Sequence, residues 1–303
     1  MAENLCLHSK KLGGFVEENF KDIRAPFGAG IELTAKCNLN CVHCYAKPDR
    51  FHKDMSTQEF KCIFDILIEK GMIEAYFTGG EIFTRPDFEE IFVYAKKKGV
   101  LLSLLTNLTL LNDNHIRLFK EYPVETISTS VYGCTKETYE SVTGVNGSFD
   151  RFIKALEKLK TSGIPFELKF ITLKQNYSDV NKAVDFAKKY EVPISVNMDI
   201  HAANDGSDSP INHRISAEEA VLFDIYDPDR AMYWESLAKD IYNGTRSLYP
   251  KRASQRFGED YLYPCSVAYQ EVYITSDCKI QGCVKSSLYY GYNLTPLKRL
   301  QKK

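Results

Sequence analysis

A regular alternation of two kinds of segment, from residue 30 to about residue 200, constrains the fold of this chain most strongly. Short runs rich in β-branched and aromatic residues alternate with longer amphipathic stretches, which is typical of repeated βα units around a parallel sheet. Helices between the strands begin at capping residues, namely Ser56 with Glu59, Ser178, and Ser216 with Glu219. We predict six strands, at Gly30–Ala35, Ile73–Thr78, Leu101–Thr106, Thr126–Val131, Phe166–Thr172 and Ile194–Asp199.

Six parallel βα units without a closing pair predict an α/β fold, a partial (β/α)6 TIM-like barrel with its active site at the carboxyl ends of the strands. We expect an N-terminal segment over residues 1–29, the barrel over 30–205, and linker helices with a small extension over 206–303. Residues 201–215 are rich in Asn, Asp, Ser, Gly and Pro, which favours a loop that leaves the barrel. Beyond it we expect helices at Ala217–Ile225 and Arg230–Tyr242 and a hairpin of Glu271–Thr275 with Lys279–Gly282.

Composition and charge exclude several classes of protein. Hydrophobic residues make up 44% and charged residues 26% of the 303 residues, which are ordinary values for a globular protein. Lys plus Arg (39) nearly balance Asp plus Glu (40), so a nucleic-acid partner is not expected. The chain has no signal-peptide pattern and no window of ~18 uncharged apolar residues, so we expect a cytoplasmic protein with no membrane partner.

Nine cysteines are an excess for an intracellular chain, because reducing compartments keep thiols free of disulfides. Metal or cluster ligation is therefore the first hypothesis for the cysteines that lie close together. Three others, Cys6, Cys62 and Cys134, are scattered and are expected to be structural. The other six cysteines form two groups, the first made of Cys37, Cys41 and Cys44 and the second of Cys265, Cys278 and Cys283, and these groups suggest two sites.

The first group puts three thiols on one tight loop directly after the first predicted strand, at the expected catalytic face. Iron–sulfur clusters usually take four Cys ligands, so three on one loop would leave one iron open to another molecule. A zinc site or a buried thiol cluster is the alternative, since Cys also binds zinc. Structural zinc needs a fourth nearby ligand, and His43, between two of the thiols, is poorly placed to close the same tetrahedron.

The spacing Cys37-x-x-x-Cys41-x-x-Cys44, with the aromatic His43 before the last Cys, resembles the signature of the radical S-adenosylmethionine (SAM) superfamily. The resemblance implies that these three residues hold a [4Fe-4S] cluster whose open iron binds the amino and carboxylate groups of SAM, with His43 beside the cofactor. It further implies that one electron, from a low-potential donor, cleaves SAM to a 5′-deoxyadenosyl radical that abstracts hydrogen from substrate.

A second segment supports this resemblance. Thr78-Gly79-Gly80-Glu81 ends the second predicted strand and resembles the GGE motif of the family. Glycines allow close backbone approach, and a carboxylate accepts hydrogen bonds from an ammonium group. The resemblance therefore places Gly79, Gly80 and Glu81 at the methionine amine of SAM, with Thr78 beside them; a plain glycine turn is the alternative.

Two further strand ends resemble family positions that face the cofactor. Thr106 and Asn107 end the third strand, and Ser130, near the end of the fourth, would contact the ribose or carboxylate of SAM. Simple capping roles are the alternative for these polar residues. Leu108 stands where the family often has Gly. The matches run in register over residues 30–200, about two thirds of the chain.

The second cysteine group, Cys265, Cys278 and Cys283, surrounds the predicted hairpin and resembles the start of a SPASM or twitch extension. In relatives this extension carries auxiliary iron–sulfur clusters, so these three residues are candidate ligands of an auxiliary [4Fe-4S] cluster. Cys278 replaces the usual glycine after the turn residue Asp277, and the later cysteines of the pattern are missing before Lys303. We expect a truncated chain; a degenerate site, a site completed by Cys278 and an exogenous ligand, and inert cysteines in a small β domain are the alternatives.

These observations predict a radical SAM enzyme that abstracts hydrogen from a peptide or protein side chain, an assignment that rests on analogy with relatives. No peptide-recognition domain precedes the barrel, so a leader-peptide reader is expected elsewhere. A radical SAM dehydrogenase that acts on a small molecule is the alternative enzyme. A non-catalytic metal- or cluster-binding protein is the alternative from another class, and a thiol–disulfide protein is disfavoured because three cysteines on one loop are not the usual CxxC pair.

Overall fold

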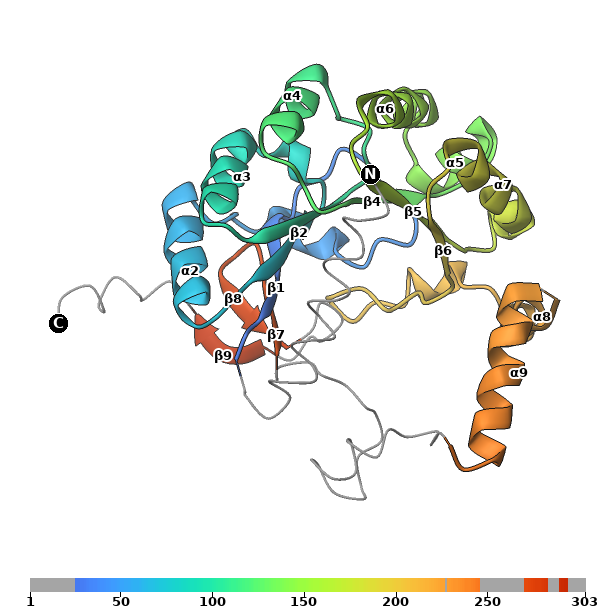
Figure 1. Ribbon diagram of the computed structural model, residues 1–303. Coiled ribbons are helices and arrows are strands. Elements are labelled where there is room, and N and C mark those ends of the chain that lie inside the picture. Colours follow the sequence, from blue (N-terminus) through green and yellow to red (C-terminus); the bar gives the residue numbers. More distant parts are fainter. Residues whose placement is uncertain (1–24, 227, 246–269, 283–288, 294–303) are drawn as a thin grey trace. The chain divides into compact units, whose positions relative to one another are not determined.

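The computed structural model describes residues 25–226, 228–245, 270–282 and 289–293 (Figure 1). The chain divides into two compact units, Met1–Arg214 with Ala268–Lys303, and Ile215–Val267. The first unit contains all of the described strands: β1 (Gly28–Thr34), β2 (Glu74–Gly79), β3 (Leu101–Thr106), β4 (Ile127–Val131), β5 (Phe166–Ile171), β6 (Ile194–Asn197), β7 (Glu271–Ile274), β8 (Lys279–Gln281) and β9 (Tyr289–Asn293).

These strands form one sheet in the order β6-β5-β4-β3-β2-β1-β7-β8-β9. All pairs from β6 through β1 to β7 are parallel, whereas β8 pairs antiparallel with both β7 and β9. Parallel neighbours need a crossover connection, and helices supply it between β1 and β6. The α/β fold predicted from the sequence, a partial TIM-like barrel, is therefore confirmed.

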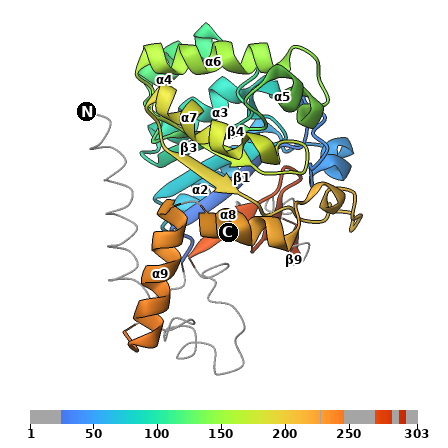
Figure 2. The same ribbon diagram turned by 90° about the vertical axis from the view of Figure 1, so that its right-hand side faces the viewer.

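The helices of the first unit cover one face of this sheet (Figures 1 and 2). Phe77 of β2 packs beneath Phe60 and Phe64 of helix α2, with ring centroids 5.5 and 6.3 Å apart. The helical elements are η1 (Lys47–Phe51), α2 (Thr57–Glu69), η2 (Ile82–Thr84), α3 (Phe88–Lys97), α4 (Asp113–Glu121), α5 (Lys136–Thr143), α6 (Ser148–Ser162), η3 (Tyr177–Asp179), α7 (Val180–Tyr190) and η4 (Ile211–His213).

Alternation along the strands separates the core from the inner face of the barrel. In β2, Ala75 and Phe77 are buried beneath the helices, whereas Glu74, Tyr76 and Thr78 are partly exposed and line a cavity on the opposite face. Successive side chains of a strand point to opposite faces, so a strand with one covered face carries polar residues at every second position. The inner face of β2 is consequently polar, while Leu101 and Leu105 of β3 add apolar side chains to the wall of the same cavity.

The C-terminal segment extends the sheet beside β1. Strand β7 pairs parallel with β1, from Gly28 opposite Glu271 to Ile31 opposite Ile274, and turns back into β8, which confirms the predicted hairpin. A Cβ atom on Gly30 would lie 2.3 Å from the hydroxyl of Tyr76 and 2.7 Å from the ring of Tyr273. Only glycine fits this position, because the two rings occupy the space that a side chain would need.

The turn after β7 also contacts the barrel. The backbone N–H of Ser276 donates to Oε2 of Glu32 at 3.1 Å, and the N–H of Met55 donates to the carbonyl of Ser276 at 2.6 Å. Burial raises the pKa of Glu32 to about 7, against the opposing effect of the Ser276 hydrogen bond. Hydrogen bonds at Ser276 thus join the hairpin to Glu32 of β1 and to Met55, which precedes α2.

The capping predictions have mixed outcomes. Ser56 and Glu59 form a complete capping box at the start of α2, and Ser216 and Glu219 bond reciprocally before the next unit's first helix. The prediction for Ser178 is wrong, because this residue lies inside η3 and no side chain caps α7.

Asp179 takes the N-cap position of α7, but its carboxylate is used elsewhere. It accepts from the N–H of Cys134 at 3.0 Å and from the hydroxyl of Thr138 at 2.6 Å. These bonds tie the start of α7 to the chain after β4. A tertiary partner therefore outcompetes the local cap that the sequence suggested.

The second unit contains helices α8 (Ala217–Tyr226) and α9 (Pro228–Tyr242), which confirms the two helices predicted there. Every helix in the part of the chain that the structure describes is too short or too polar to cross a lipid bilayer. The predicted boundary at residue 205 stays a prediction.

Candidate active site

The thiol loop follows β1 and is held by the end of helix α5. The N–H of Asn40 donates to the carbonyl of Thr143, and the N–H of Val42 donates to the carbonyl of Val142, both at 2.9 Å. Gly144 ends α5 with φ 65°, and a Cβ atom there would lie 3.1 Å from the carbonyl oxygen of Asn40. A glycine C-cap thus lets the loop of the three cysteines lie directly on the helix end.

Several N–H groups point at the sulfurs of this loop. The Sγ atom of Cys37 accepts from the N–H of Leu39 at 3.4 Å and from Nδ2 of Asn107 at 3.7 Å. Nη2 of Arg50 lies 4.0 Å from the Sγ atom of Cys44. Hydrogen bonds to sulfur stabilise a thiolate and tune the potential of a cluster that it binds.

Burial raises the pKa of Cys37 and of Cys41, and for Cys41 the neighbouring thiols of Cys44 and Cys37 raise it further. Three thiolates so placed need a cationic partner, and a bound metal deprotonates its thiol ligands. As the side chains lie, no three His, Cys, Asp or Glu residues of the described ranges converge closely enough to hold a single metal ion. The ligand set of Cys37, Cys41 and Cys44 stays a prediction.

Asp54, which the sequence did not single out, anchors the end of β1. Its carboxylate accepts from the hydroxyl of Thr34 at 2.8 Å and from the N–H of Ala35 at 3.0 Å. The ammonium of Lys36 lies 3.7 Å away. A carboxylate that accepts from the chain just before Cys37 fixes where the thiol loop begins.

Arg85 supports the same strand from below. It is 7% exposed and donates from Nη1 to the carbonyl of Leu33 at 2.6 Å and from Nε to Asp87 at 2.8 Å. The run Arg85-Pro86-Asp87 after the GGE segment was visible in the sequence, so a buried Arg–Asp pair could have been proposed there. A guanidinium satisfied by a carboxylate and a carbonyl can be buried without an unpaired charge.

Gly79 and Gly80 pack against the end of β1. A Cβ atom on Gly79 would lie 2.3 Å from the carbonyl oxygen of Thr34, and one on Gly80 would lie 2.3 Å from that of Lys36. The N–H groups of Gly80 and Glu81 donate to the same two carbonyls, each at 2.8 Å. The close approach that these glycines permit is therefore to the chain's own backbone beside the thiol loop.

Glu81 is 1% exposed and joins the ends of β2 and β3. Its Oε1 accepts from the hydroxyl of Thr106 at 2.7 Å and from the N–H of Phe83 at 3.1 Å, and its Oε2 accepts from the N–H of Asn107 at 2.7 Å. Burial raises the pKa of Glu81 to about 7 in spite of these bonds. Since a carboxylate oxygen has two lone pairs, Oε2 can accept one further donor.

The side chain of Asn107 connects this network to the thiol loop. Its Nδ2 donates to Oδ1 of Asn38 at 3.0 Å as well as to the sulfur of Cys37, and its Oδ1 accepts from Thr109. Asn38 in turn donates to Thr109 at 2.8 Å. Asn38 was not predicted as a site residue, although its position between two of the cysteines was a usable signal.

Leu108 adopts the left-handed conformation, with φ 69°, although it is fully buried. This is the position where a Gly would be usual, and the backbone keeps the geometry that favours Gly. The N–H of Leu108 donates to the hydroxyl of Thr106 at 2.9 Å. Packing and hydrogen bonding thus hold a conformation that costs a branched residue about 1 kcal/mol or more.

His43 and Ser130 lie around Tyr132, which follows β4. The ring of His43 is 5.3 Å from that of Tyr132, and its Nδ1 is buried without a hydrogen-bond partner in the described ranges. Burial, and then the proximity of His213 and Lys47, lowers the pKa of His43 to about 4, so this imidazole is neutral at physiological pH. Ser130 forms a hydrogen bond with Tyr132.

The second group of cysteines is only partly described. Cys265 and Cys283 lie outside the described residues. Cys278 sits in the turn between β7 and β8 with φ 65°, in the left-handed conformation that explains the usual glycine there. Its side chain is 3% exposed, and burial, followed by Glu59 and Asp277, raises its pKa to about 11. An auxiliary cluster on these residues stays a prediction.

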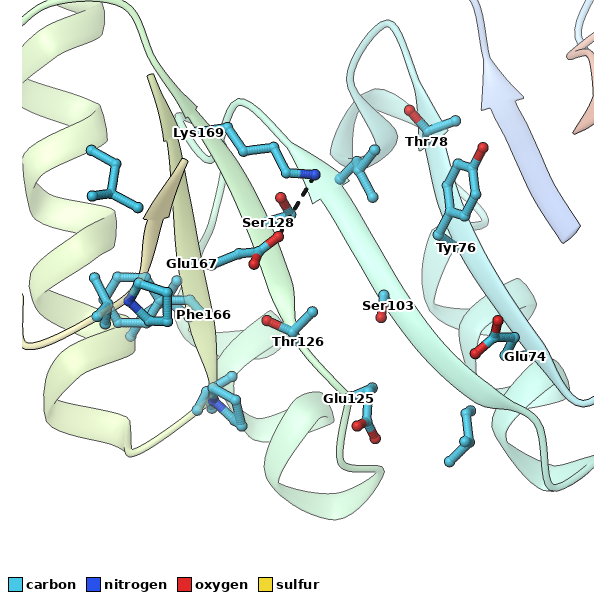
Figure 3. Close-up of a pocket in the computed structure, with 18 of the residues that line it drawn as sticks. Glu74, Tyr76, Thr78, Ser103, Glu125, Thr126, Ser128, Phe166, Glu167 and Lys169 are labelled. Atoms are coloured by element: carbon cyan, nitrogen blue, oxygen red, sulfur yellow. Dashed lines mark ion pairs between the residues drawn. The ribbon is translucent and has the colours of Figure 1, made fainter. Parts of the chain in front are cut away.

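Below the thiol loop and the Glu81 network, the inner face of the sheet encloses a cavity of about 1480 Å³. Tyr45, next to Cys44, and Thr78, next to Gly79, both line it. Figure 3 shows the polar residues of its wall, which come from β2 to β5 and the turn before β4. Most of the lining residues lie at the amino ends of the strands and in the turns before them, so the cavity runs from that end of the barrel toward the predicted catalytic residues at the carboxyl ends.

The sequence profile of the Radical SAM superfamily matches residues 31–187, more than half of the chain. The chain belongs to this superfamily. The match spans the thiol loop, the Glu81 network and the strands that line the cavity, from β1 to β5.

Named relatives differ in what they act on. Fe-coproporphyrin III synthase of Methanosarcina barkeri is 33% identical over 190 residues, which are 62% of this chain and 47% of that protein. The antilisterial bacteriocin subtilosin biosynthesis protein AlbA of Bacillus subtilis is 33% identical over 167 residues, 54% of this chain and 36% of that protein. The chain thus spans less than half the length of these two curated relatives.

Among solved structures, Streptococcus suis SuiB bound to the precursor peptide SuiA superposes with a TM-score of 0.62. The match covers 96% of this chain and 68% of that one, at 16% identity. This likeness establishes a shared fold.

The superfamily implies a [4Fe-4S] cluster and SAM, and the residues present fit both. Three thiols on one loop receive N–H donors, as thiolate ligands of a cluster require. The Oε2 atom of Glu81 keeps acceptor capacity for an ammonium group. Cys37, Cys41 and Cys44 would hold the cluster, with Gly79, Gly80 and Glu81 at the methionine part of SAM.

Proposed function

We propose that this protein is a radical SAM enzyme that modifies a side chain of a peptide or protein. The observation that carries the proposal is the hydrogen-bonded connection between Cys37, Asn107 and Glu81 at the carboxyl ends of the strands, toward which the cavity of the barrel extends. When bound, the cluster and SAM supply a 5′-deoxyadenosyl radical that abstracts hydrogen from a substrate C–H bond.

The residues of the chain act mainly by positioning. Glu81 and Asn107 hold the ends of β2 and β3 against the thiol loop, so that the binding groups for SAM keep a fixed relation to the cysteines. Thr78 near the end of β2 and Ser130 near the end of β4 are proposed to contact SAM, and Thr106 acts through Glu81. His43, neutral and packed on Tyr132, is proposed to shield the thiols from water.

The size of the cavity supports a peptide substrate. Its volume of about 1480 Å³ exceeds the ~300–1,000 Å³ that are usual for small-molecule pockets. AlbA, by its name, takes part in making a bacteriocin, and SuiB was solved with a precursor peptide. A small-molecule substrate is the second candidate, favoured by the likeness to Fe-coproporphyrin III synthase.

The test is anaerobic reconstitution with iron and sulfide, chemical reduction in place of the low-potential electron donor, and assay of 5′-deoxyadenosine. The wild type is expected to form this product, and Cys41→Ala to form none. A chain that binds zinc, gains no iron-derived absorbance and leaves SAM intact would instead be a non-catalytic metal-binding protein.

Iron content tests the proposed SPASM- or twitch-like site on Cys265, Cys278 and Cys283. About four irons per chain would correspond to the thiol-loop cluster alone, and about eight to a filled auxiliary cluster. Cys278→Ser is the matched variant, since it should lower the iron content only in the second case. A cytoplasmic location remains part of the proposal.

A further inference from the structure

Three polar residues from two neighbouring strands meet on the wall of the cavity. Ser128 of β4 stands opposite Glu167 of β5 in the strand register, and Ser130 stands opposite Lys169. Ser128, Glu167 and Lys169 all line the cavity, and Figure 3 shows them gathered along these two strands. We call them the wall cluster.

The wall cluster has unused hydrogen-bonding capacity. Ser128 is 4% exposed, and its buried hydroxyl has no partner in the described ranges. The ammonium of Lys169 lies 3.6 Å from Oε1 of Glu167, farther than a good charge-assisted hydrogen bond of about 2.7–2.9 Å. A buried hydroxyl without a partner costs free energy, and a ligand that bonds to it would recover that cost.

The charges around the cavity oppose an anionic ligand. Five glutamates line it, Glu74, Glu125, Glu167, Glu191 and Glu271, against three lysines, Lys160, Lys169 and Lys188. Lys160 forms an ion pair with Glu191, and Lys188 forms one with Asp185. The third lysine of the lining, Lys169, pairs with Glu167.

The carboxylates of Glu74 and Glu271 flank Gly28 and have no ion pair with a described residue. Burial raises the pKa of Glu74, and the neighbouring Glu271 and Glu125 raise it further. An additional carboxylate in this space would meet uncompensated negative charge, whereas a neutral or cationic group would not.

We propose that Ser128, Glu167 and Lys169 bind the backbone N–H and C=O of one residue of an extended peptide segment that carries no acidic side chain inside the barrel. Lys169 and Ser128 donate to the C=O of this residue, and Glu167 accepts its N–H, since the two groups of one residue point to the same side of an extended chain. This inference rests on the proposed function and names the class of substrate that the same cavity selects.

An amide fits the wall cluster better than a carboxylate does. A carboxylate could accept from Lys169 and Ser128, but it would displace Glu167 and leave that charge beside it. One residue of an extended peptide offers a C=O acceptor and an N–H donor on the same side of the chain, which match the ammonium and hydroxyl donors and the neighbouring carboxylate acceptor. The excess of glutamates in the lining adds to this preference.

The test measures binding by calorimetry to the reconstituted full chain with SAM, under anaerobic conditions. The probes are three decapeptides of equal length with blocked termini, one uncharged, one with three Lys and one with three Glu, and the tricarboxylate tricarballylate. The uncharged and Lys peptides are expected to bind, with the Glu peptide weaker by about tenfold and tricarballylate weaker still.

Single variants locate the effect. Lys169→Gln should weaken binding of the uncharged peptide by about five- to tenfold, and Glu167→Gln should reduce the disadvantage of the Glu peptide by a similar factor. Lys154→Gln, on the exposed face of α6, is the matched control and should change the dissociation constant of neither the uncharged peptide nor the Glu peptide. Thermal melting of each variant checks that the barrel is folded.

The inference is overturned if the three peptides bind equally, or if tricarballylate binds most tightly and loses affinity in Lys169→Gln. The second result would assign the cavity to a carboxylated small molecule. The two proposals fail separately: absence of 5′-deoxyadenosine with normal peptide selectivity refutes the proposed reaction alone. Product formation without charge selectivity refutes the wall cluster alone.

Discussion

The end of strand β2 and the wall of the cavity are built from the same kinds of residue, yet their hydrogen bonding differs. At the strand end, Glu81 accepts three hydrogen bonds and Thr106 donates one of them. On the wall, the hydroxyl of Ser128 has no partner in the described ranges, and Glu167 has a loosely placed lysine. All four residues lie within or directly after parallel strands of the same sheet.

The difference indicates what each region does. Polar groups whose partners all come from the chain fix the framework, because any movement would leave a buried group unpaired. Polar groups without such partners are costly unless another molecule supplies them. The Glu81 network therefore positions the catalytic end, whereas the wall cluster awaits a ligand. Four sets of variants test this difference.

Gly80→Ala should have the largest effect. The new Cβ atom would lie 2.3 Å from the carbonyl oxygen of Lys36, so the turn after β2 must separate from the thiol loop. We expect at least a hundredfold loss of 5′-deoxyadenosine formation and about 3 kcal/mol or more of stability, measured by product assay and urea unfolding. Gly28→Ala is the control, since its nearest contact would be an ordinary 3.4 Å; equal losses in both would contradict the argument.

Glu81→Gln should be the next most damaging change. One oxygen becomes an N–H₂ group that faces donors from Phe83 and Thr106 or from Asn107, so at least one buried donor loses its acceptor. A loss of about 2–4 kcal/mol in the free energy of unfolding is expected. Glu167→Gln is the matched variant on the wall and should change stability by less than about 1 kcal/mol. Similar losses in both would remove the distinction between framework and wall.

Glu32→Gln tests the attachment of the hairpin through the pH dependence of stability. Burial raises the pKa of Glu32 from 4.5 to about 7, so the folded state holds a proton that the unfolded state releases in this range. The contribution of Glu32 to the free energy of unfolding therefore falls as the pH rises from 4.5 to 7, and it stays low above pH 7.

Because Gln carries no charge, the free energy of unfolding of the variant, relative to that of the wild type, should rise by about 2–3 kcal/mol from pH 5 to pH 8. Urea unfolding at both values measures the change. A difference between the two proteins that does not vary with pH would show that Glu32 is not buried as an acid.

The smallest effects are expected from two hydroxyl deletions. Thr106→Val removes a donor to Glu81 and should cost about 1–2 kcal/mol, whereas Ser128→Ala removes a hydroxyl without a protein partner and should cost less than about 0.5 kcal/mol. Ser128→Ala should still weaken binding of the uncharged peptide. Equal costs in urea unfolding would indicate that Ser128 has a partner within the protein.

Much of the fold could be predicted from the sequence, because local patterns carry it. The six strands were placed within a few residues of their observed bounds, since alternation and β-branched runs report a covered face directly. The hairpin of β7 and β8 was also visible, but not its place beside β1. That pairing joins residues about 240 positions apart, and no local pattern encodes it.

The site divides in the same way. Cysteine spacing and the GGE segment marked Cys37, Cys41, Cys44 and Glu81, because ligands on one loop and glycines in one turn are local features. Asp54 and Arg85 were missed because each acts on backbone atoms distant in sequence. The residue type of Asp54 is ordinary for a solvent-exposed position, so only its contacts distinguish it, whereas the run Arg85-Pro86-Asp87 offered a local signal.

By itself, the sequence determined the parallel α/β architecture, the superfamily and the loop that carries the thiols, since periodicity and motif spacing are properties of the chain. Only the tertiary contacts show that Glu81 accepts from Thr106, Phe83 and Asn107, whereas the hydroxyl of Ser128 has no partner in the described ranges. The physical reason is that a hydrogen bond depends on distances between atoms that folding brings together, and those distances determine which polar groups hold the framework and which face a ligand.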